Sequence, residues 1–90
     1  MKPSQDQVAQ GIRSFLMKDR VPAVESIGGQ DNLFERGLLD SLEIVALVTF
    51  LEEQFGCSLD FDDLTEANLG TIQSMVSLVG SKIGGFANNG

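Results

Sequence analysis

The sequence predicts a small all-α protein, a four-helix bundle with a long loop between its first and second helices and a short third helix. Three observations predict this fold: apolar residues recur at three- and four-residue intervals in three segments, a capping residue precedes each of these segments, and the chain is short. Its 90 residues are 42% hydrophobic and include no Trp or Tyr. A chain of this length forms one domain with a small core.

The first helix is expected to begin near Ser4. Ser4 and Gln7 fit a capping box, in which the Ser4 side chain accepts from the Gln7 N–H and the Gln7 side chain reaches back. One apolar stripe follows at helical spacing, formed by Val8, Ile12, Phe15 and Leu16. The helix should end within residues 18–20, because Pro22 biases Val21 toward an extended conformation.

A long loop is expected over residues 22–40, where turn-forming residues occur without a sustained period. A loop of this length in a compact domain usually serves a function. Four apolar side chains are expected to pin it to the core: Leu33, Phe34, Leu38 and Leu39. We expect the loop to present the helix that follows it.

The second helix, over residues 41–55, has the strongest pattern. Asp40 can cap it, and Glu43 adds a carboxylate to the first turn, where the helix dipole favours negative charge. Its inward stripe is formed by Ile44, Leu47, Val48, Leu51 and Phe55. Gly56 provides a stop at its C-terminal end.

The rest of the chain predicts a short helical turn over residues 60–66, a break at residues 68–70 and a last helix capped by Thr71. The last helix carries an apolar stripe of Ile72, Met75, Val76 and Val79. From Gly80 onward Gly, Ser and Asn predominate, which favours a frayed end. We therefore expect a folded domain over residues 1–80 and a flexible tail over residues 81–90.

Composition and charge narrow the function. Thirteen acidic residues against six basic ones give a net charge of −7, which disfavours nucleic acids and anionic lipids and favours basic partner surfaces. No apolar run reaches the roughly 20 residues of a membrane span, and the N-terminus lacks the apolar segment of a secretory signal, so we expect a cytoplasmic location without membrane insertion.

Intrinsic catalysis and metal binding are also disfavoured. The chain has no His, and Cys57 is its single Cys, so a Ser-His-Asp or Cys-His arrangement is impossible and no disulfide forms within the chain. The same lack of Cys and His removes the usual metal clusters. We therefore expect a protein that is not an enzyme and that binds no metal. We also expect a monomer.

The start of the second helix is the candidate site. In residues 38–43 (LLDSLE), the Ser41 hydroxyl stands at the amino end of a long helix. Free backbone amides and the positive end of the helix dipole would stabilise a phosphate esterified at such a position. The alternative interpretation is that Ser41 only favours the helix start, as Ser commonly does.

The outward side of this helix carries a second set of apolar residues. They recur at helical intervals away from the core stripe: Leu42, Val45, Ala46 and Thr49. Three carboxylates border them, those of Glu43, Glu52 and Glu53. A partly apolar row with a charged rim is typical of a docking surface for a transient partner. The alternative is burial under the long loop, above all for Val45.

The segments GLLDSL (residues 37–42) and EEQFG (residues 52–56) resemble the acyl carrier protein family, and the resemblance covers about residues 5–80. The family includes peptidyl and D-alanyl carrier proteins. The resemblance implies that Ser41 receives a 4′-phosphopantetheine arm, on which acyl or aminoacyl groups travel as thioesters. It further implies that Asp40 helps the transferase through contacts or metal coordination in the docked complex. Leu42, next to the attachment site, and the outer row would fill partner pockets, and the second helix would dock each enzyme in turn.

The resemblance also implies the partners: a phosphopantetheinyl transferase, an acyl- or aminoacyl-loading ligase, and downstream transferases or synthases. Carriers of primary fatty-acid synthesis typically have Glu in place of Ala46 and Met in place of Thr49, so a specialised fatty acid or polyketide pathway is favoured. An aminoacyl, D-alanyl or peptidyl carrier is the alternative. A non-catalytic helical interaction module with the carrier fold is the alternative from another class.

Two further patterns have simpler interpretations. Residues 60–63 (DFDD) could indicate a calcium loop, but an EF-hand needs Gly and Glu where this chain has Thr65 and Thr71. We expect a solvated acidic turn there. The six Phe residues and Met75 are expected to pack in the core.

Overall fold

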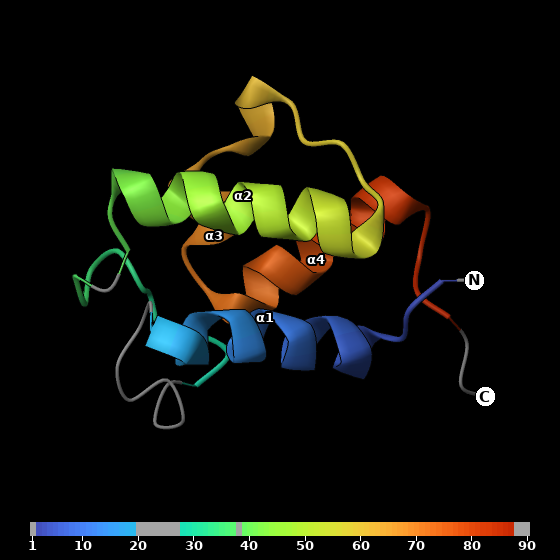
Figure 1. Ribbon diagram of the computed structural model, residues 1–90, viewed down its shortest axis with the longest axis horizontal. Helices are drawn as coiled ribbons and strands as arrows, with labels where there is room; N and C mark the ends of the chain where they lie inside the picture. Colours follow the sequence, from blue (N-terminus) through green and yellow to red (C-terminus); the bar gives the residue numbers. More distant parts are fainter. Residues whose placement is uncertain (1, 20–27, 38, 88–90) are drawn as a thin grey trace.

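The computed structural model describes residues 2–19, 28–37 and 39–87, and within them the protein is all-α. The elements in chain order are α1 (Gln5–Asp19), α2 (Ser41–Phe55), the 3₁₀ turn η2 (Phe61–Asp63), α3 (Glu66–Leu69) and α4 (Ile72–Ile83). Figure 1 shows α1 and α2 side by side with α4 crossing between them, and η2 on the side of α2 away from α1. Since α4 contacts the other three helices, it is the central element of the predicted bundle.

The first helix begins as its sequence predicts. The Gln7 N–H donates to Ser4 Oγ at 3.1 Å, and the Ser4 N–H donates to the Gln7 side-chain oxygen at 2.8 Å. This capping box satisfies N–H groups that a first helical turn would leave without partners. The Phe15 ring stacks on Phe50 of α2, with centroids 4.6 Å apart. The inward stripe of α1 is fully buried at Val8, Ile12 and Leu16.

The third helix lies later in the chain than the sequence predicts. The turn expected over residues 60–66 is split into η2 and α3, and the break expected at residues 68–70 falls largely within α3. Thr65 accounts for the shift, because its side chain accepts from the Asn68 N–H at 3.2 Å and so caps a helix there. Leu69, which the sequence places in the break, is buried and joins α3 to the core.

The last helix begins as predicted but ends later. Thr71 and Ser74 form a capping box, in which the Ser74 N–H donates to Thr71 Oγ1 at 2.9 Å. The apolar stripe predicted for this helix is buried throughout. The helix continues past Gly80 to Ile83 and ends where Gly84 adopts a φ of 81°. Glycine adopts this left-handed conformation without the strain that a Cβ would bring.

The residues that follow the predicted boundary at residue 80 pack against the bundle. Phe86 lies over Gly80, where an added Cβ would come within 2.5 Å of the Phe86 ring. The Ala87 N–H donates to the Pro3 carbonyl at 2.8 Å, so the two ends of the described chain meet. This contact joins residues far apart in sequence, so local composition does not reveal it. The packed part of the chain therefore extends to residue 87, and residues 88–90 lie outside the described residues.

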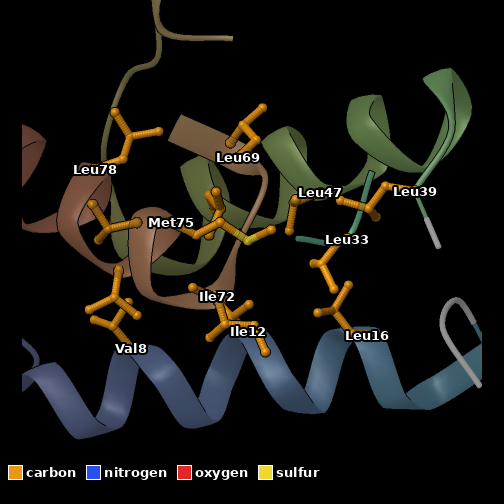
Figure 2. Packing of buried hydrophobic residues seen from close by; sticks show 13 residues of the cluster. Val8, Ile12, Leu16, Leu33, Leu39, Leu47, Leu69, Ile72, Met75 and Leu78 are labelled. Carbon is orange, nitrogen blue, oxygen red and sulfur yellow. The ribbon is translucent and has the colours of Figure 1, made fainter. Parts of the chain in front are cut away.

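The core lies where the helices meet, as Figure 2 shows. Met75 of α4 is fully buried and points toward Leu47 of α2. Fully burying such a side chain contributes about 1.5–3 kcal/mol. Of the residues expected to pin the long loop, Leu33 and Leu39 are in the core and Phe34 packs partly against it. Leu38 and residues 22–27 lie outside the described residues.

Candidate functional site

The start of α2 places an exposed hydroxyl directly after a capped turn. Asp40 has an extended backbone with a φ of −119°, and its Oδ1 accepts from the Glu43 N–H at 2.9 Å. The predicted cap is therefore confirmed. Ser41 is the first residue of the helix and is exposed, as is Leu42 after it. A group attached to the Ser41 hydroxyl would extend into solvent.

Hydrogen bonds from the preceding loop fix the position of this helix start. They tie the loop to α3 and to the first residues of α4, and Leu39 is buried immediately before the cap. The three contacts are the Leu33 N–H to the Gly70 carbonyl at 2.6 Å, the Gln73 N–H to the Gly29 carbonyl at 2.9 Å, and the Asn32 amide to the Glu66 carboxylate at 3.3 Å. The loop therefore presents α2 from a fixed base.

The backbone at this position favours a negative group. The first bond within the helix is donated by the Ile44 N–H to the Asp40 carbonyl at 3.0 Å. The N–H groups of Ser41 and Leu42 precede it and have no partner within the helix by position. Together with the helix dipole, they stabilise a nearby anion by about 0.3–1 kcal/mol when the site is exposed. The Asp40 and Glu43 carboxylates oppose this effect, and solvent screens both contributions.

The residues predicted to form the docking surface differ in their exposure to solvent. The side chains of Leu42 and Val45 are 81% and 65% exposed, so the alternative in which the loop buries Val45 is wrong. Thr49 and Glu53 are exposed as well, whereas Ala46 and Glu43 are half-buried. The helix thus presents a partly apolar face to solvent on the side away from the core.

Glu52, predicted as part of the charged rim, has a structural contact. It is half-buried, and its carboxylate accepts from the Leu59 N–H at 2.9 Å. This bond holds the segment between α2 and η2 against the helix. Glu53 is the neighbouring carboxylate that faces solvent.

Phe61 lies outside the core, although all six Phe residues were expected to pack there. It is 88% exposed at the first position of η2. The signal that could have identified it is its place between acidic residues in a segment without helical period. The expected solvated acidic turn is present there, with Asp60 and Asp62 exposed.

A salt bridge fastens η2 to the last helix. Lys82 Nζ lies 2.7 Å from Asp63 Oδ2. The hydrogen bond from the Lys82 ammonium holds the pKa of Asp63 below its usual value, and the Asp63 carboxylate raises the pKa of Lys82. Both groups therefore stay charged through the neutral range.

The surroundings of Cys57 favour a structural role for its thiol. The residue is buried, and its thiol donates to the Leu51 carbonyl at 3.5 Å. Burial, with the Glu52 carboxylate nearby, raises the pKa of Cys57, so the thiol stays protonated and unreactive at neutral pH. In the described ranges, no group of three or more His, Cys, Asp or Glu side chains is placed to hold a metal ion. No helix in the same ranges has the length and apolar character to cross a membrane.

A family model described as "Phosphopantetheine attachment site" matches residues 6–79. The chain belongs to this family of carrier proteins. The carrier protein is also 38% identical over 55 residues to the "Probable acyl carrier protein PigG" of Serratia sp. (strain ATCC 39006). That alignment covers 61% of this chain and 63% of the relative, which is less than two thirds of the relative's length.

A solved structure shares the fold of this carrier protein. It is the crystal structure of an engineered Bradyrhizobium japonicum glycine:[carrier protein] ligase complexed with a carrier protein from Agrobacterium tumefaciens and ATP. The match has a TM-score of 0.70 and 24% sequence identity, and it covers 80% of this chain and 95% of the other.

Carriers of this family hold covalently attached 4′-phosphopantetheine and are themselves non-catalytic. The geometry at the start of α2 fits such a group. An exposed hydroxyl stands where backbone amides and the helix dipole favour the negative charge of a phosphodiester. Both Ser41 and Leu42 are exposed in the structure.

Proposed function

We propose that this carrier protein holds its 4′-phosphopantetheine on Ser41 and presents acyl or aminoacyl groups to partner enzymes of a specialised biosynthetic pathway. The observation that carries the proposal is the exposure of Ser41 at the first position of α2. The hydroxyl is accessible to an enzyme from outside, while the buried Leu39 and the Asp40 cap hold the backbone beside it.

Each residue at the helix start has a defined task. Ser41 supplies the oxygen of the ester, and the amides of the first turn lower the free energy of the charge placed there. Asp40 uses Oδ1 to shape the turn and remains exposed to a docked enzyme. When bound, the arm supplies a thiol on a long flexible tether, which carries the cargo as a thioester.

The proposed partners are a phosphopantetheinyl transferase, a loading ligase, and downstream transferases or synthases in the cytoplasm. They would dock on the exposed face of α2 at Leu42, Val45, Thr49 and Glu53, with the half-buried Glu43 and Ala46 beside them. The name of the Serratia relative supports acyl cargo. The net charge of −7 favours enzymes with basic docking surfaces.

Aminoacyl cargo is the second candidate. The structure with the same fold contains a carrier bound to a glycine:[carrier protein] ligase, which makes loading by an amino acid ligase a direct alternative. Incubating the modified carrier with ATP, a candidate ligase and either a fatty acid or an amino acid distinguishes the two, because the ligase uses ATP to activate the acid and join it to the thiol, and the added mass identifies the cargo. An interaction module would need no hydroxyl at residue 41, so it would tolerate Ser41→Ala.

Intact-protein mass spectrometry tests the attachment. Incubation of the unmodified chain with coenzyme A and a broad-range phosphopantetheinyl transferase should add roughly 340 Da. Ser41→Ala should abolish the addition. Ser58→Ala is the matched control, because Ser58 is also exposed but lies outside any helix start, and it should be modified normally. A wild-type chain that gains no mass, or a Ser41→Ala chain that gains it, would contradict the proposal.

A further inference from the structure

Most of the exposed large hydrophobic residues in the described ranges belong to two segments, α2 and the η2 region. Four of its five exposed large hydrophobic residues lie on α2, on η2 or directly after η2, and the fifth is Met17 on α1. The four are Leu42, Val45, Phe61 and Leu64. Phe61 is the most exposed of them, at 88%.

Phe61 is held on a fixed turn. The Asp63 N–H donates to the Asp60 carbonyl at 2.9 Å, and the Asp60 N–H donates back to Asp63 Oδ2 at 2.8 Å. The same Asp63 side chain pairs with Lys82. The Asp63 backbone carbonyl accepts from the Asn68 side-chain amide at 2.9 Å. A side chain presented from a fixed backbone loses little conformational entropy when it binds.

The surroundings of Phe61 specify the chemistry of the partner surface. Asp60 and Asp62 flank it and are exposed, and Glu53 is exposed on the outward side of α2. Lys82 is the cation bonded to this turn, at 2.7 Å from Asp63 Oδ2 and 3.9 Å from Asp60 Oδ2, which leaves Asp62 and Glu53 as the carboxylates that face solvent without this pairing. An apolar ring bordered by carboxylates is complementary to an apolar pocket bordered by Lys and Arg.

We propose that Phe61 is a second anchor for the phosphopantetheinyl transferase that modifies Ser41, inserting into an apolar pocket on the enzyme that is ringed by basic side chains. The inference rests on the proposed function, which brings that enzyme to the start of α2. An interface of ordinary size buries about 800 Å² on each partner, a patch about 30 Å across. A helix of 15 residues is about 22 Å long.

These dimensions place Phe61 within reach. Val45, Thr49 and Glu52 recur at helical intervals on α2, and the Glu52 carboxylate accepts from the Leu59 N–H just before η2. Figure 1 shows η2 on the side of α2 away from α1. An enzyme seated on Ser41 and on the exposed face of α2 would therefore lie beside η2. The protein as a whole measures 35 × 28 × 20 Å, so one standard interface spans most of that side.

Direct binding tests the anchor. The Ser41→Ala chain, which cannot be modified, is titrated with a broad-range phosphopantetheinyl transferase by isothermal calorimetry. Adding Phe61→Ala should raise Kd roughly tenfold, the effect of losing one buried aromatic anchor. Adding Met17→Ala, the matched loss of an exposed apolar side chain on α1, should leave Kd within about twofold. Adding Asp62→Asn should weaken binding at low salt more than at high salt.

Kinetics with the Ser41-containing chain provide the second readout. Phe61→Ala should raise the KM for modification and leave kcat near that of the wild type, because it removes a docking contact and no reacting group. Circular dichroism should show an unchanged fold, since the side chain is 88% exposed. Equal Kd and KM for the wild type and Phe61→Ala would overturn the anchor.

The experiments distinguish a failure of the anchor from a failure of the proposed function. A wild-type chain that gains no mass from coenzyme A contradicts the proposed function and, with it, the anchor, which rests on that function. Normal modification with equal Kd values contradicts the anchor alone. In a third outcome, sedimentation shows that the wild type is a dimer that Phe61→Ala dissociates, while the Kd for the transferase is unchanged. The occupant of the surface is then a second copy of this chain, and the proposal is wrong.

Discussion

Replacing two leucines on opposite faces of α2 tests the orientation of this helix. Leu47 is 0% exposed and Leu42 is 81% exposed. Leu47→Ala removes three carbons from the core, which costs about 2.4 kcal/mol at about 0.8 kcal/mol for each buried carbon. The cavity left behind raises the expected loss to about 3 kcal/mol. Leu42→Ala removes the same atoms from solvent and should change the free energy of unfolding by less than about 0.5 kcal/mol.

Urea unfolding followed by circular dichroism measures both effects. A small domain has an m-value of about 1 kcal/mol per molar urea, so Leu47→Ala should lower the unfolding midpoint by about 3 M. A chain of this size is stable by about 5–13 kcal/mol, which leaves the variant enough stability to measure. Equal losses in the two variants would refute the reasoning, because the Leu42 face would then be buried and unavailable for docking.

Two more predictions concern packing and charge. Lys82 lowers the pKa of Asp63 in the folded state, so the ionised carboxylate stabilises the fold above the unfolded-state pKa of about 3.9, and this contribution disappears as pH falls through the lowered folded-state pKa. Thermal unfolding of Asp63→Asn should therefore show a lower Tm than the wild type at neutral pH, by a difference that shrinks as pH falls below about 3.9; a constant difference would contradict the pairing. Gly80→Ala should cost about 1–3 kcal/mol because its Cβ meets the Phe86 ring. In a Phe86→Ala background the same change should be neutral or stabilising by up to about 1 kcal/mol, and an equal cost in both backgrounds would refute this contact.

The features that sequence predicted well are those set by neighbouring residues. The capping box of Ser4 and Gln7, the Asp40 cap and the Thr71 cap all form as expected, because each joins groups three residues apart. The termination of α2 at Gly56 likewise follows from one residue, whose φ is 67°. The candidate hydroxyl at residue 41 is predictable for the same reason, since it directly follows a cap.

The features that sequence missed depend on distant contacts or on competition between local signals. Phe86 packs on Gly80 and Ala87 bonds to Pro3, and neither contact has a local signature. The structural contact of Glu52 was also missed. Its bond to the Leu59 N–H spans seven residues, so helical spacing alone placed Glu52 in the charged rim. At α3, the cap from Thr65 prevailed over the turn signal that follows it.

The position of Phe61 shows where residue type misleads. A Phe is usually buried, so the hydrophobic pattern alone places it in the core. The exposed ring becomes visible only once Asp60, Asp63 and Lys82 are seen to fix the turn from which it projects. The exposed apolar face of α2, in contrast, follows from helical spacing, because Leu42 and Val45 fall opposite the core stripe.

The central claim is that one exposed hydroxyl at the start of α2 carries the prosthetic arm. Its most direct test is site localisation: the chain is modified with coenzyme A and a transferase, cleaved, and fragmented in a tandem mass spectrometer. The account predicts that every fragment containing Ser41, and no fragment lacking it, carries the roughly 340 Da addition. The addition on any other residue, or its absence from the Ser41 fragments, would contradict the account.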